Sequence, residues 1–370
     1  MDCKKVGIIT FQMANNYGAL LQNYGLQRAL LKKNIDCETI NYYSDDLQKA
    51  YKCFRKPTGS LKRDINRKLF EFLNLKGYIS SCRNFNKFRK VFLNLSEKVY
   101  DYRTISNSDY YIYITGSDQV WNKNIVRKTD EQAFKLDFTD NIKISYAASC
   151  GADSNLFDNL DFLKTYKLIS LREKSLFNII SKKFPNSVCV CDPVFLLSKE
   201  EWVSNLNLKT NGKSDYLYLY YVDDKKNETI EIAKYISSQN NYKIYVPKML
   251  DKQLLSSRYG ISCFSDGPIQ FLEKIYNANF VVASSFHGVA FSIIFEKEFV
   301  TVAHSVTGSR VRDLLEYLGL MDRVVNDLDD YISRKDNFKK IDYKIVKQKL
   351  NAYIKESESF IDEIYSLLHN

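Results

Sequence analysis

The segment Asn277–Glu296 constrains the fold of this chain more than any other part of the sequence. Its apolar, β-type run Phe280–Ala283 stops at Ser284 and Ser285, and a helix of small and apolar residues is predicted directly after them. His287 therefore lies at the start of a helix that follows a strand. In an open parallel sheet, turns at the carboxyl ends of strands bind ligands, and a helix N-terminus favours an anion.

A second predicted strand, Tyr110–Thr115, ends in a short polar turn. The turn places Ser117 and Gln119 on either side of Asp118. A carboxylate at this position can orient or deprotonate a hydroxyl group, but it can equally cap the following helix. The pattern leaves both roles open.

Two further units repeat the strand, turn and helix order. In Val6–Leu31 the strand leads into a helix through a turn where Gly18 lets a ligand approach the backbone closely. In Leu168–Glu173 the strand ends at Arg172, whose rigid guanidinium suits a carboxylate or a phosphate. A structural ion pair with Glu173 explains this arginine equally well. The first turn also contains Asn15, Asn16 and Tyr17.

The sequence excludes several classes of site. Neither a dinucleotide fingerprint nor a P-loop is present. Eight cysteines and three histidines are scattered without metal-ligand spacing, so we expect no metal and no bound cofactor. The chain enters a strand directly after its first residues, and no apolar run approaches the length of a membrane span. These features favour a cytoplasmic protein with reduced cysteines.

The alternation of strands and helices predicts an α/β protein with parallel sheets. A chain of 370 residues exceeds the usual size of one domain, so two domains are expected. The polar stretch Ser198–Asp215 is the expected linker. We therefore predict a first domain over 1–205, a second over 206–340, and a C-terminal amphipathic helix over 341–370.

Positive charge is concentrated in one segment. The chain has a net charge of +10, and residues 55–90 hold eleven basic and two acidic side chains, interleaved with aromatic residues and leucines. This segment belongs to a predicted helical insertion over 52–95. It favours peripheral contact with an anionic membrane, which salt-dependent binding to liposomes would test, or a solvated helix pair. Nucleic acid is not expected as a partner, because no recognised nucleic-acid-binding motif accompanies the basic residues.

Seven motifs occur in a fixed order along the chain. With them the sequence resembles the polysaccharide pyruvyl transferase family over roughly residues 6–323. The resemblance implies a fold like that of the GT-B glycosyltransferases, with two Rossmann-like domains facing a cleft and a C-terminal helix that packs back on the first domain. The motifs are NNYGALLQNYGLQ, GSDQVWN, YAASCG, SLREKS, CDPVFLL, GPIQFLEKIYNANFVVASSFHGVAFSIIF and GSRVRDLLEYLGL.

The resemblance also implies an enzyme. It would transfer the enolpyruvyl group of phosphoenolpyruvate to a sugar of a polysaccharide or of a lipid-linked precursor, close a pyruvate ketal, and release phosphate without a metal. His287 would be the general acid, Arg172 would hold phosphate or carboxylate, and Asp118 would serve the acceptor hydroxyl. His304 is the alternative acid. The expected location is the cytoplasm, with peripheral contact on the inner face of the cytoplasmic membrane.

One position departs from the family. Many members have an arginine two residues before the histidine, where this chain has Ser285. Arg310 and Arg312 are the expected substitutes, although a solvated helix face accounts for them equally well. The expected donor-binding residues are Ser284, Ser285, Gly288, Arg310 and Arg312, and the expected acceptor-binding residues are Asn15, Asn16, Tyr17, Gly18, Ser117 and Gln119.

Two rival functions stay open at this level. The first is a glycosyltransferase of the same architecture that binds a nucleotide-sugar near Ser265–Phe271. The second is a non-catalytic subunit of a polysaccharide assembly complex. The sequence does not specify the acceptor sugar, its linkage (undecaprenyl pyrophosphate is one candidate carrier), or the oligomeric state.

Overall fold

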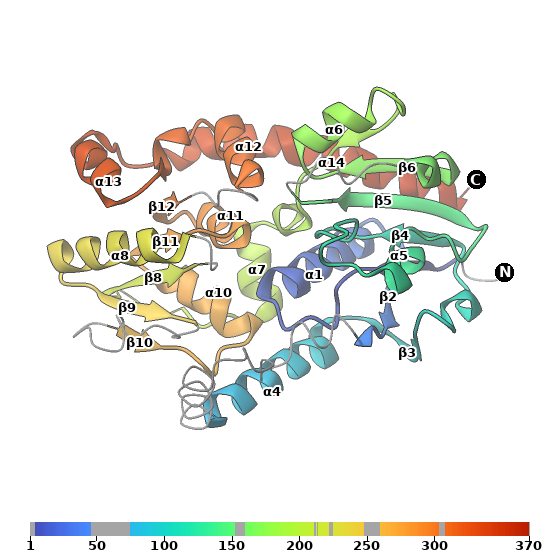
Figure 1. Cartoon of the computed structure of the whole chain (residues 1–370), viewed down its shortest axis with the longest axis horizontal. Coiled ribbons are helices and arrows are strands. Elements are labelled where there is room, and N and C mark those ends of the chain that lie inside the picture. The colour runs from blue at the N-terminus through green and yellow to red at the C-terminus, as the bar shows by residue number, and fades with distance from the viewer. Residues whose placement is uncertain are drawn as a thin grey trace.

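Two parallel sheets form the framework of the molecule (Figure 1). The computed structural model describes residues 4–45, 75–151, 160–210, 212, 214–221, 225–247, 260–302 and 308–369. Every strand pair within these residues is parallel, and each sheet is covered by helices. The predicted α/β class with parallel sheets is confirmed.

The first sheet has the strand order β3-β2-β1-β4-β5-β6-β7. Its direction of growth reverses between β1 and β4, the position where open sheets of this kind bind ligands. All residues of these two strands are buried, as expected for strands covered on both faces. The strands are β1 (Val6–Ile9), β2 (Cys37–Tyr42), β3 (Leu95–Tyr100), β4 (Ile112–Thr115), β5 (Ile142–Ala148), β6 (Tyr166–Leu171) and β7 (Val188–Cys189). The helices are α1 (Tyr17–Lys32), α4 (Leu75–Phe92), α5 (Lys128–Phe134), α6 (Lys174–Ile180) and α7 (Lys199–Leu206), with short 3-10 helices η1 (Ile105–Asn107), η3 (Asp161–Thr165) and η4 (Pro193–Leu196).

The second sheet has the order β10-β9-β8-β11-β12-β13 and reverses between β8 and β11. Its strands are β8 (Tyr216–Tyr220), β9 (Lys243–Val246), β10 (Gly260–Ser262), β11 (Phe280–Ala283), β12 (Glu298–Val302) and β13 (Val324–Val325). Its helices are α8 (Lys226–Asn240), α10 (Pro268–Asn277), α11 (Phe286–Ile294), α12 (Ser309–Leu318) and α13 (Leu328–Arg334), followed by α14 (Tyr343–His369), with 3-10 helices η6 (Met321–Arg323) and η7 (Lys335–Asn337). The strand predicted over Phe280–Ala283 is therefore confirmed.

The expected linker contains a helix that the sequence analysis did not recognise. Ser198 caps α7, because its side chain accepts a hydrogen bond from the backbone N–H of Glu201. The Glu201 side chain in turn accepts one from the backbone N–H of Ser198. The helix ends at Asn207, which has left-handed backbone dihedrals. Its Trp202 is fully buried. The polar composition of this segment reflects its caps and its exposed face, and does not indicate a lack of structure.

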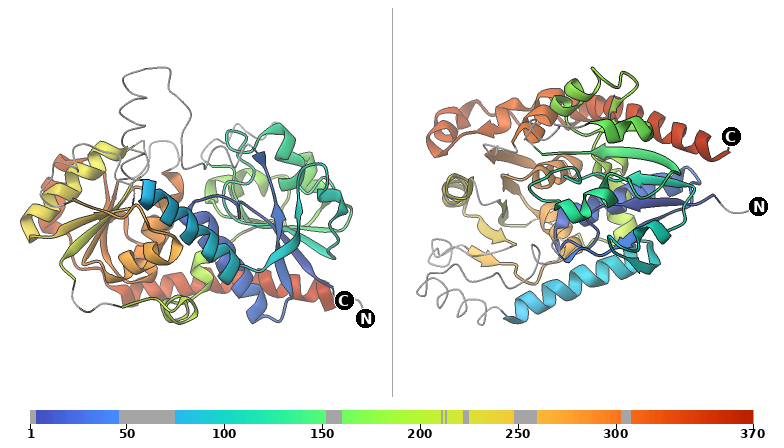
Figure 2. Two further views of the ribbon diagram at one scale, coloured as in Figure 1. Left: turned by 90° about the horizontal axis from the view of Figure 1, so that it is seen from below. Right: turned by 45° about the vertical axis from the view of Figure 1, so that its right-hand side comes forward.

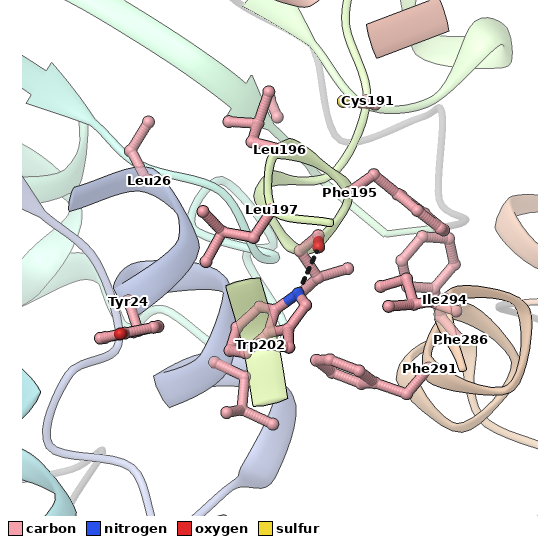
Figure 3. Packing of buried hydrophobic residues seen from close by; sticks show 14 of the residues in the cluster. Tyr24, Leu26, Cys191, Phe195, Leu196, Leu197, Trp202, Phe286, Phe291 and Ile294 are labelled. Carbon is pink, nitrogen blue, oxygen red and sulfur yellow. Dashed lines mark hydrogen bonds between the residues drawn. The ribbon is translucent and has the colours of Figure 1, made fainter. Parts of the chain in front are cut away.

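Aromatic packing joins the two domains into one hydrophobic core. The ring of Tyr17, from α1, stacks on that of Phe271, from α10, with their centroids 4.6 Å apart. Trp202 contacts Tyr24 of the first domain and Phe291 of the second (Figure 3). The Trp202 indole N–H donates to the carbonyl of Val194, 3.0 Å away. The relative position of the two sheets is therefore set by close packing and not by a flexible linker alone.

Helix α4 crosses from the first domain to the second (Figure 2). Near its N-terminal half, Ser81 donates to the carbonyl of Asp266 at 2.8 Å, and Asn84 donates to the carbonyl of Ser265 at 2.7 Å. Toward its C-terminal end, the buried Arg89 donates to the carbonyls of residues 12–14 and to the side chain of Asn15. Side chains of α4 are thus hydrogen-bonded both to the turn before α1 and to the residues that precede α10.

Helix α14 crosses on the other side of the molecule (Figures 1 and 2). Ser357 accepts a hydrogen bond from the backbone N–H of Cys191 at 2.9 Å, and Tyr353 donates to the carbonyl of Val190 at 3.1 Å. Phe360 packs against Tyr146 of β5. The prediction that the C-terminal helix packs back on the first domain is confirmed.

Much of the predicted basic insertion, residues 46–74, lies outside the described residues. In its described part, α4 has an exposed face with Lys76, Arg83, Lys87 and Lys90. Among the helices that the structure describes, none is long and apolar enough to cross a membrane. Cys82 of α4 is disulfide-bonded, so the expectation of reduced cysteines is wrong at this position. Sequence spacing did not reveal the bond because Cys82 belongs to no short cysteine motif.

We expect Phe271→Ala to destabilise both domains together. Phe271 is fully buried and contacts Tyr17 from the other domain, so truncation removes apolar contacts from the shared core. Loss of a buried phenylalanine costs about 3–5 kcal/mol in the free energy of unfolding. Urea denaturation followed by circular dichroism measures the effect, with Ile345→Ala, at a half-exposed position of α14, as a control within about 0.5 kcal/mol of wild type. Two separate transitions, with only one shifted, would contradict a shared core.

Candidate active site

The strand ends of both domains meet at one place. His287 is the second residue of α11, directly after β11, and Arg172 directly follows β6. Ser285 caps α11 by accepting a hydrogen bond from the backbone N–H of Gly288 at 3.1 Å. The small turn that the sequence predicted therefore forms the start of the helix and fixes the histidine at its mouth.

Arg172 is the centre of a buried group of charges. Its Nη1 donates to Asp192 Oδ2 at 2.8 Å and to Ser117 Oγ at 3.4 Å, and its Nη2 lies 3.6 Å from Glu173 Oε1. Burial lowers the pKa of the guanidinium, but the charges of Glu173, Asp192 and Asp118 outweigh burial and raise it above its usual value. Arg172 is therefore a permanent cation at the end of β6.

Asp192 links this arginine to the histidine. Its Oδ2 lies 3.6 Å from His287 Nε2, and its Oδ1 accepts from the backbone N–H of Val194 at 3.1 Å. Burial raises the pKa of the Asp192 carboxyl, but His287 and Arg172 outweigh burial and hold this pKa well below its usual range. The carboxylate is thus ionised and faces the imidazole of His287.

Gly18 contacts the opposite edge of the imidazole. A Cβ atom built on Gly18 would lie 2.1 Å from His287 Nδ1, far inside any allowed contact. Gly18 belongs to α1 and Asp192 is the N-cap residue of η4, both in the first domain, whereas His287 belongs to the second. The histidine is therefore enclosed by residues of the other domain, and its position depends on how the domains pack.

A second arginine completes the site. Arg310, on α12, is largely buried, with its Nε 3.9 Å from Glu173 Oε1, the oxygen that also accepts a hydrogen bond from Ser149 Oγ. Burial lowers the pKa of Arg310, and the positive charge of Arg172 lowers it further. One glutamate thus lies between two guanidinium groups, one from each domain.

The two arginines keep unused hydrogen-bond donors. Arg172 Nε and Nη2 and Arg310 Nε are buried and make no hydrogen bond among the described residues. Buried donors without a partner cost free energy, so such groups call for an explanation. Both arginines line a cavity of about 250 Å³. An anion in this cavity could accept hydrogen bonds from these donors, although the carboxylates of Glu173, Asp192, Asp313 and Glu356 also line it.

Aromatic and aliphatic side chains form the other walls of this cavity. The Arg172 guanidinium lies 5.3 Å from the ring centroid of Phe286, the residue before the histidine. The cavity lies between both domains and α14. Its apolar lining includes Phe177, Phe195, Phe286, Leu314, Tyr317 and Tyr353.

The remaining predicted residues have varied surroundings. Asp118 has a positive φ of 85°, accepts from the backbone N–H of Gln119 at 2.8 Å, and lies close enough to Arg172 and Arg310 to affect their pKa values. Ser117 is buried, with its Oγ 3.4 Å from Asp192. Gln119 accepts a hydrogen bond from Asn122 at 2.6 Å.

Three predicted acceptor residues make structural contacts. Asn16 caps α1 through the backbone N–H of Ala19, Asn15 binds Arg89, and Tyr17 is buried in the domain interface. Their role in acceptor binding stays a prediction.

The predicted donor residues also differ in exposure. Ser284 is buried, and Gly288 is packed against Ala283 and Tyr220. Arg312 is exposed and does not line the cavity, in contrast to Arg310. His304 lies outside the described residues.

Sequence reasoning assigned no role to Asp192. The CDPVFLL motif did contain a local pattern that marks this residue, an aspartate that follows a strand and precedes a proline. That pattern predicts a cap, which Asp192 provides for η4, but it does not reveal that the other carboxylate oxygen faces Arg172 and His287. Within the described residues, no group of three His, Cys, Asp or Glu side chains could hold a metal ion.

The fold defines the broad class of the protein. UDP-GlcNAc 2-epimerase from Methanocaldococcus jannaschii, in complex with UDP-GlcNAc and UDP, superposes with a TM-score of 0.55 and 13% identity, covering 99% of this chain and 100% of that one. UDP-GlcNAc 2-epimerase from Neisseria meningitidis, bound to UDP-GlcNAc, superposes with a TM-score of 0.55 and 11% identity, covering 99% of this chain and 100% of that one. At such low identity these likenesses show the fold alone, which is the GT-B-like arrangement.

The sequence then assigns the family. A family model of the polysaccharide pyruvyl transferases matches residues 16–306, and the chain belongs to that family. A search of curated proteins found no match. The predicted family and GT-B-like fold are both confirmed.

We expect Gly18→Ala to displace His287, because the added methyl group has no space beside the imidazole. Overpacking of this kind costs about 1–3 kcal/mol in stability. NMR of the imidazole nitrogens measures the displacement directly, since the chain has only three histidines. Gly212→Ala is the matched control, because a Cβ there meets nothing within 4 Å. Unchanged His287 signals in Gly18→Ala would show that the contact is not maintained in solution.

Proposed function

We propose that this protein transfers the enolpyruvyl group of phosphoenolpyruvate to a sugar of a polysaccharide or lipid-linked oligosaccharide precursor, forming a pyruvate ketal and releasing phosphate. The observation that carries this proposal is the pair of arginines, Arg172 and Arg310, with unused N–H donors on one cavity. His287 does not line this cavity itself but lies 3.6 Å from Asp192, which does. Membership of the polysaccharide pyruvyl transferase family supports the same reaction class.

The donor suits the unused guanidinium N–H groups on this cavity. Phosphoenolpyruvate has a phosphate and a carboxylate, and guanidinium groups bind both through paired N–H donors. Arg172 approaches from the first domain and Arg310 from the second, so the donor would contact both. In this proposal Arg310 supplies the guanidinium that many family members place two residues before the histidine, where this chain has Ser285.

His287 is the proposed general acid. As an acceptor hydroxyl attacks C2 of the donor, the methylene carbon takes the proton of the imidazolium and becomes a methyl group, through an oxocarbenium-like state. A second hydroxyl of the same sugar then attacks C2 and the bond from C2 to the phosphate oxygen breaks. The proton of this hydroxyl leaves with the phosphate as the ketal closes. Asp192 provides the counter-charge for the imidazolium, and the arginines stabilise the departing phosphate.

Asp118 is the proposed group for the acceptor. Asp118 follows β4 at the same edge of the sheet. Its positive φ is an uncommon backbone conformation for a non-glycine residue, and such conformations are often found at functional sites. It would orient the attacking hydroxyl or accept its proton. An acceptor attached to a membrane lipid would also give a role to the basic exposed face of α4, which suits an anionic surface.

We expect phosphoenolpyruvate to raise the melting temperature, whereas uridine and guanosine diphosphate-sugars should not. A ligand at one hundred times its Kd stabilises the folded state by about 2.7 kcal/mol. Arg310→Gln should abolish most of the shift. Arg312→Gln, two residues further along the same helix but exposed, should preserve it. A shift with a nucleotide-sugar and none with phosphoenolpyruvate would instead favour a glycosyltransferase.

We expect His287→Gln to slow turnover roughly 10²–10⁴-fold, the usual contribution of a positioned acid. Glutamine is polar and of similar size, so the fold and most of the donor affinity should be preserved. Phosphate release and ketal formation, measured together, should fall in parallel. His369→Gln, at the exposed end of α14, should have little effect. Turnover near the wild-type rate in His287→Gln would remove the histidine from the mechanism.

A further inference from the structure

A second cavity of about 250 Å³ lies at the opposite edge of the second sheet. Ser214, Asn279 and Lys297 precede β8, β11 and β12, so they lie at the amino ends of these strands, whereas His287 lies at the carboxyl ends. The helix α11 connects the two places, with His287 near its first residue and Lys297 shortly after its last. We call this cavity the lysine pocket and define it by Lys199, Ser214, Tyr276, Asn279, Phe295 and Lys297.

The lysine pocket has more positive than negative charge. Glu296 forms ion pairs with Lys199, at 2.7 Å, and with Lys347. Lys297 has no carboxylate at ion-pair distance among the described residues. Three ammonium groups thus surround one carboxylate, and the ammonium of Lys297 is the one without a direct counter-ion.

Two of these ammonium groups lie beside the ring of Tyr276, and both lysines line the pocket. The Nζ atoms of Lys297 and Lys199 lie 5.4 Å and 5.9 Å from its ring centroid. Burial lowers the pKa of Lys297 to about 8, and the positive charge of Lys199 contributes to the shift. Both effects disfavour the charged lysine, and an anion between the two ammonium groups would relieve both.

Two further groups border the lysine pocket. Glu296 adopts a φ of 56°, a left-handed conformation that is uncommon for a non-glycine residue, and its side chain forms ion pairs with Lys199 and Lys347. Ser214 Oγ lies 2.8 Å from Asn279 Oδ1. The same hydroxyl also donates to the backbone carbonyl of Asn277, so its single proton is shared between the two oxygens.

We propose that the lysine pocket is a second ligand site that binds a phosphate-class oxyanion between the ammonium groups of Lys199 and Lys297. Orthophosphate and the phosphate group of a sugar monophosphate share this chemistry. The proposal does not depend on the reaction proposed for the active site, because none of its residues lines that cavity.

Acetylation of lysines by a neutral amine-reactive ester, read by peptide mass spectrometry, tests the site on the wild-type protein. With orthophosphate at ten times its Kd, roughly one site in eleven stays free, so labelling of Lys297 should fall about ten-fold. Chloride at equal ionic strength should have no such effect, and exposed Lys344 should label at an unchanged rate. Parallel titration with glucose 1-phosphate shows which source of phosphate binds more tightly.

Two variants separate the lysine pocket from the active site. Lys199→Gln should weaken the protection of Lys297 by phosphate, because it removes one of the two cations. Arg310→Gln should leave the protection intact. An acetylation rate of Lys297 that does not change during the phosphate titration would overturn the proposal. So would protection that is lost in Arg310→Gln and kept in Lys199→Gln, because phosphate would then act through the active-site cavity.

Discussion

The contact between α1 of the first domain and α10 and α11 of the second determines the rest of this structure. Tyr17 stacks on Phe271, and the next residue, Gly18, lies against His287. The same interface therefore stabilises the domain arrangement and positions the candidate acid. The stacked rings pack without any ligand, so the interface itself positions the histidine.

Electrostatics then act within this rigid frame. Asp192 pairs with Arg172 and faces His287, and Glu173 lies between Arg172 and Arg310. Each carboxylate is buried, and a buried charge is tolerated only when it is paired. The carboxylates also hold two guanidinium groups in a cavity without using all of their donors. The site thus presents unused N–H donors from both domains on one cavity.

Sequence reasoning recovered the parts of the site that local pattern encodes. His287 and Arg172 were found because each follows an apolar strand, and the structure brings both to one edge, as parallel strand order requires. Asp192 was missed because its role depends on partners that are distant in sequence. The linker was predicted without a helix because capping residues are polar, and α7 begins with such a cap.

The sequence by itself determined the two parallel sheets, the family, and the residues at the strand ends, because periodicity and turn chemistry are local properties of the chain. Only the tertiary structure separated Arg310, which lines the cavity, from Arg312, which is exposed on the same helix. It also showed that His287 is enclosed by Gly18 and Asp192 of the other domain. Such contacts depend on packing between distant segments, which spacing along a single chain does not specify.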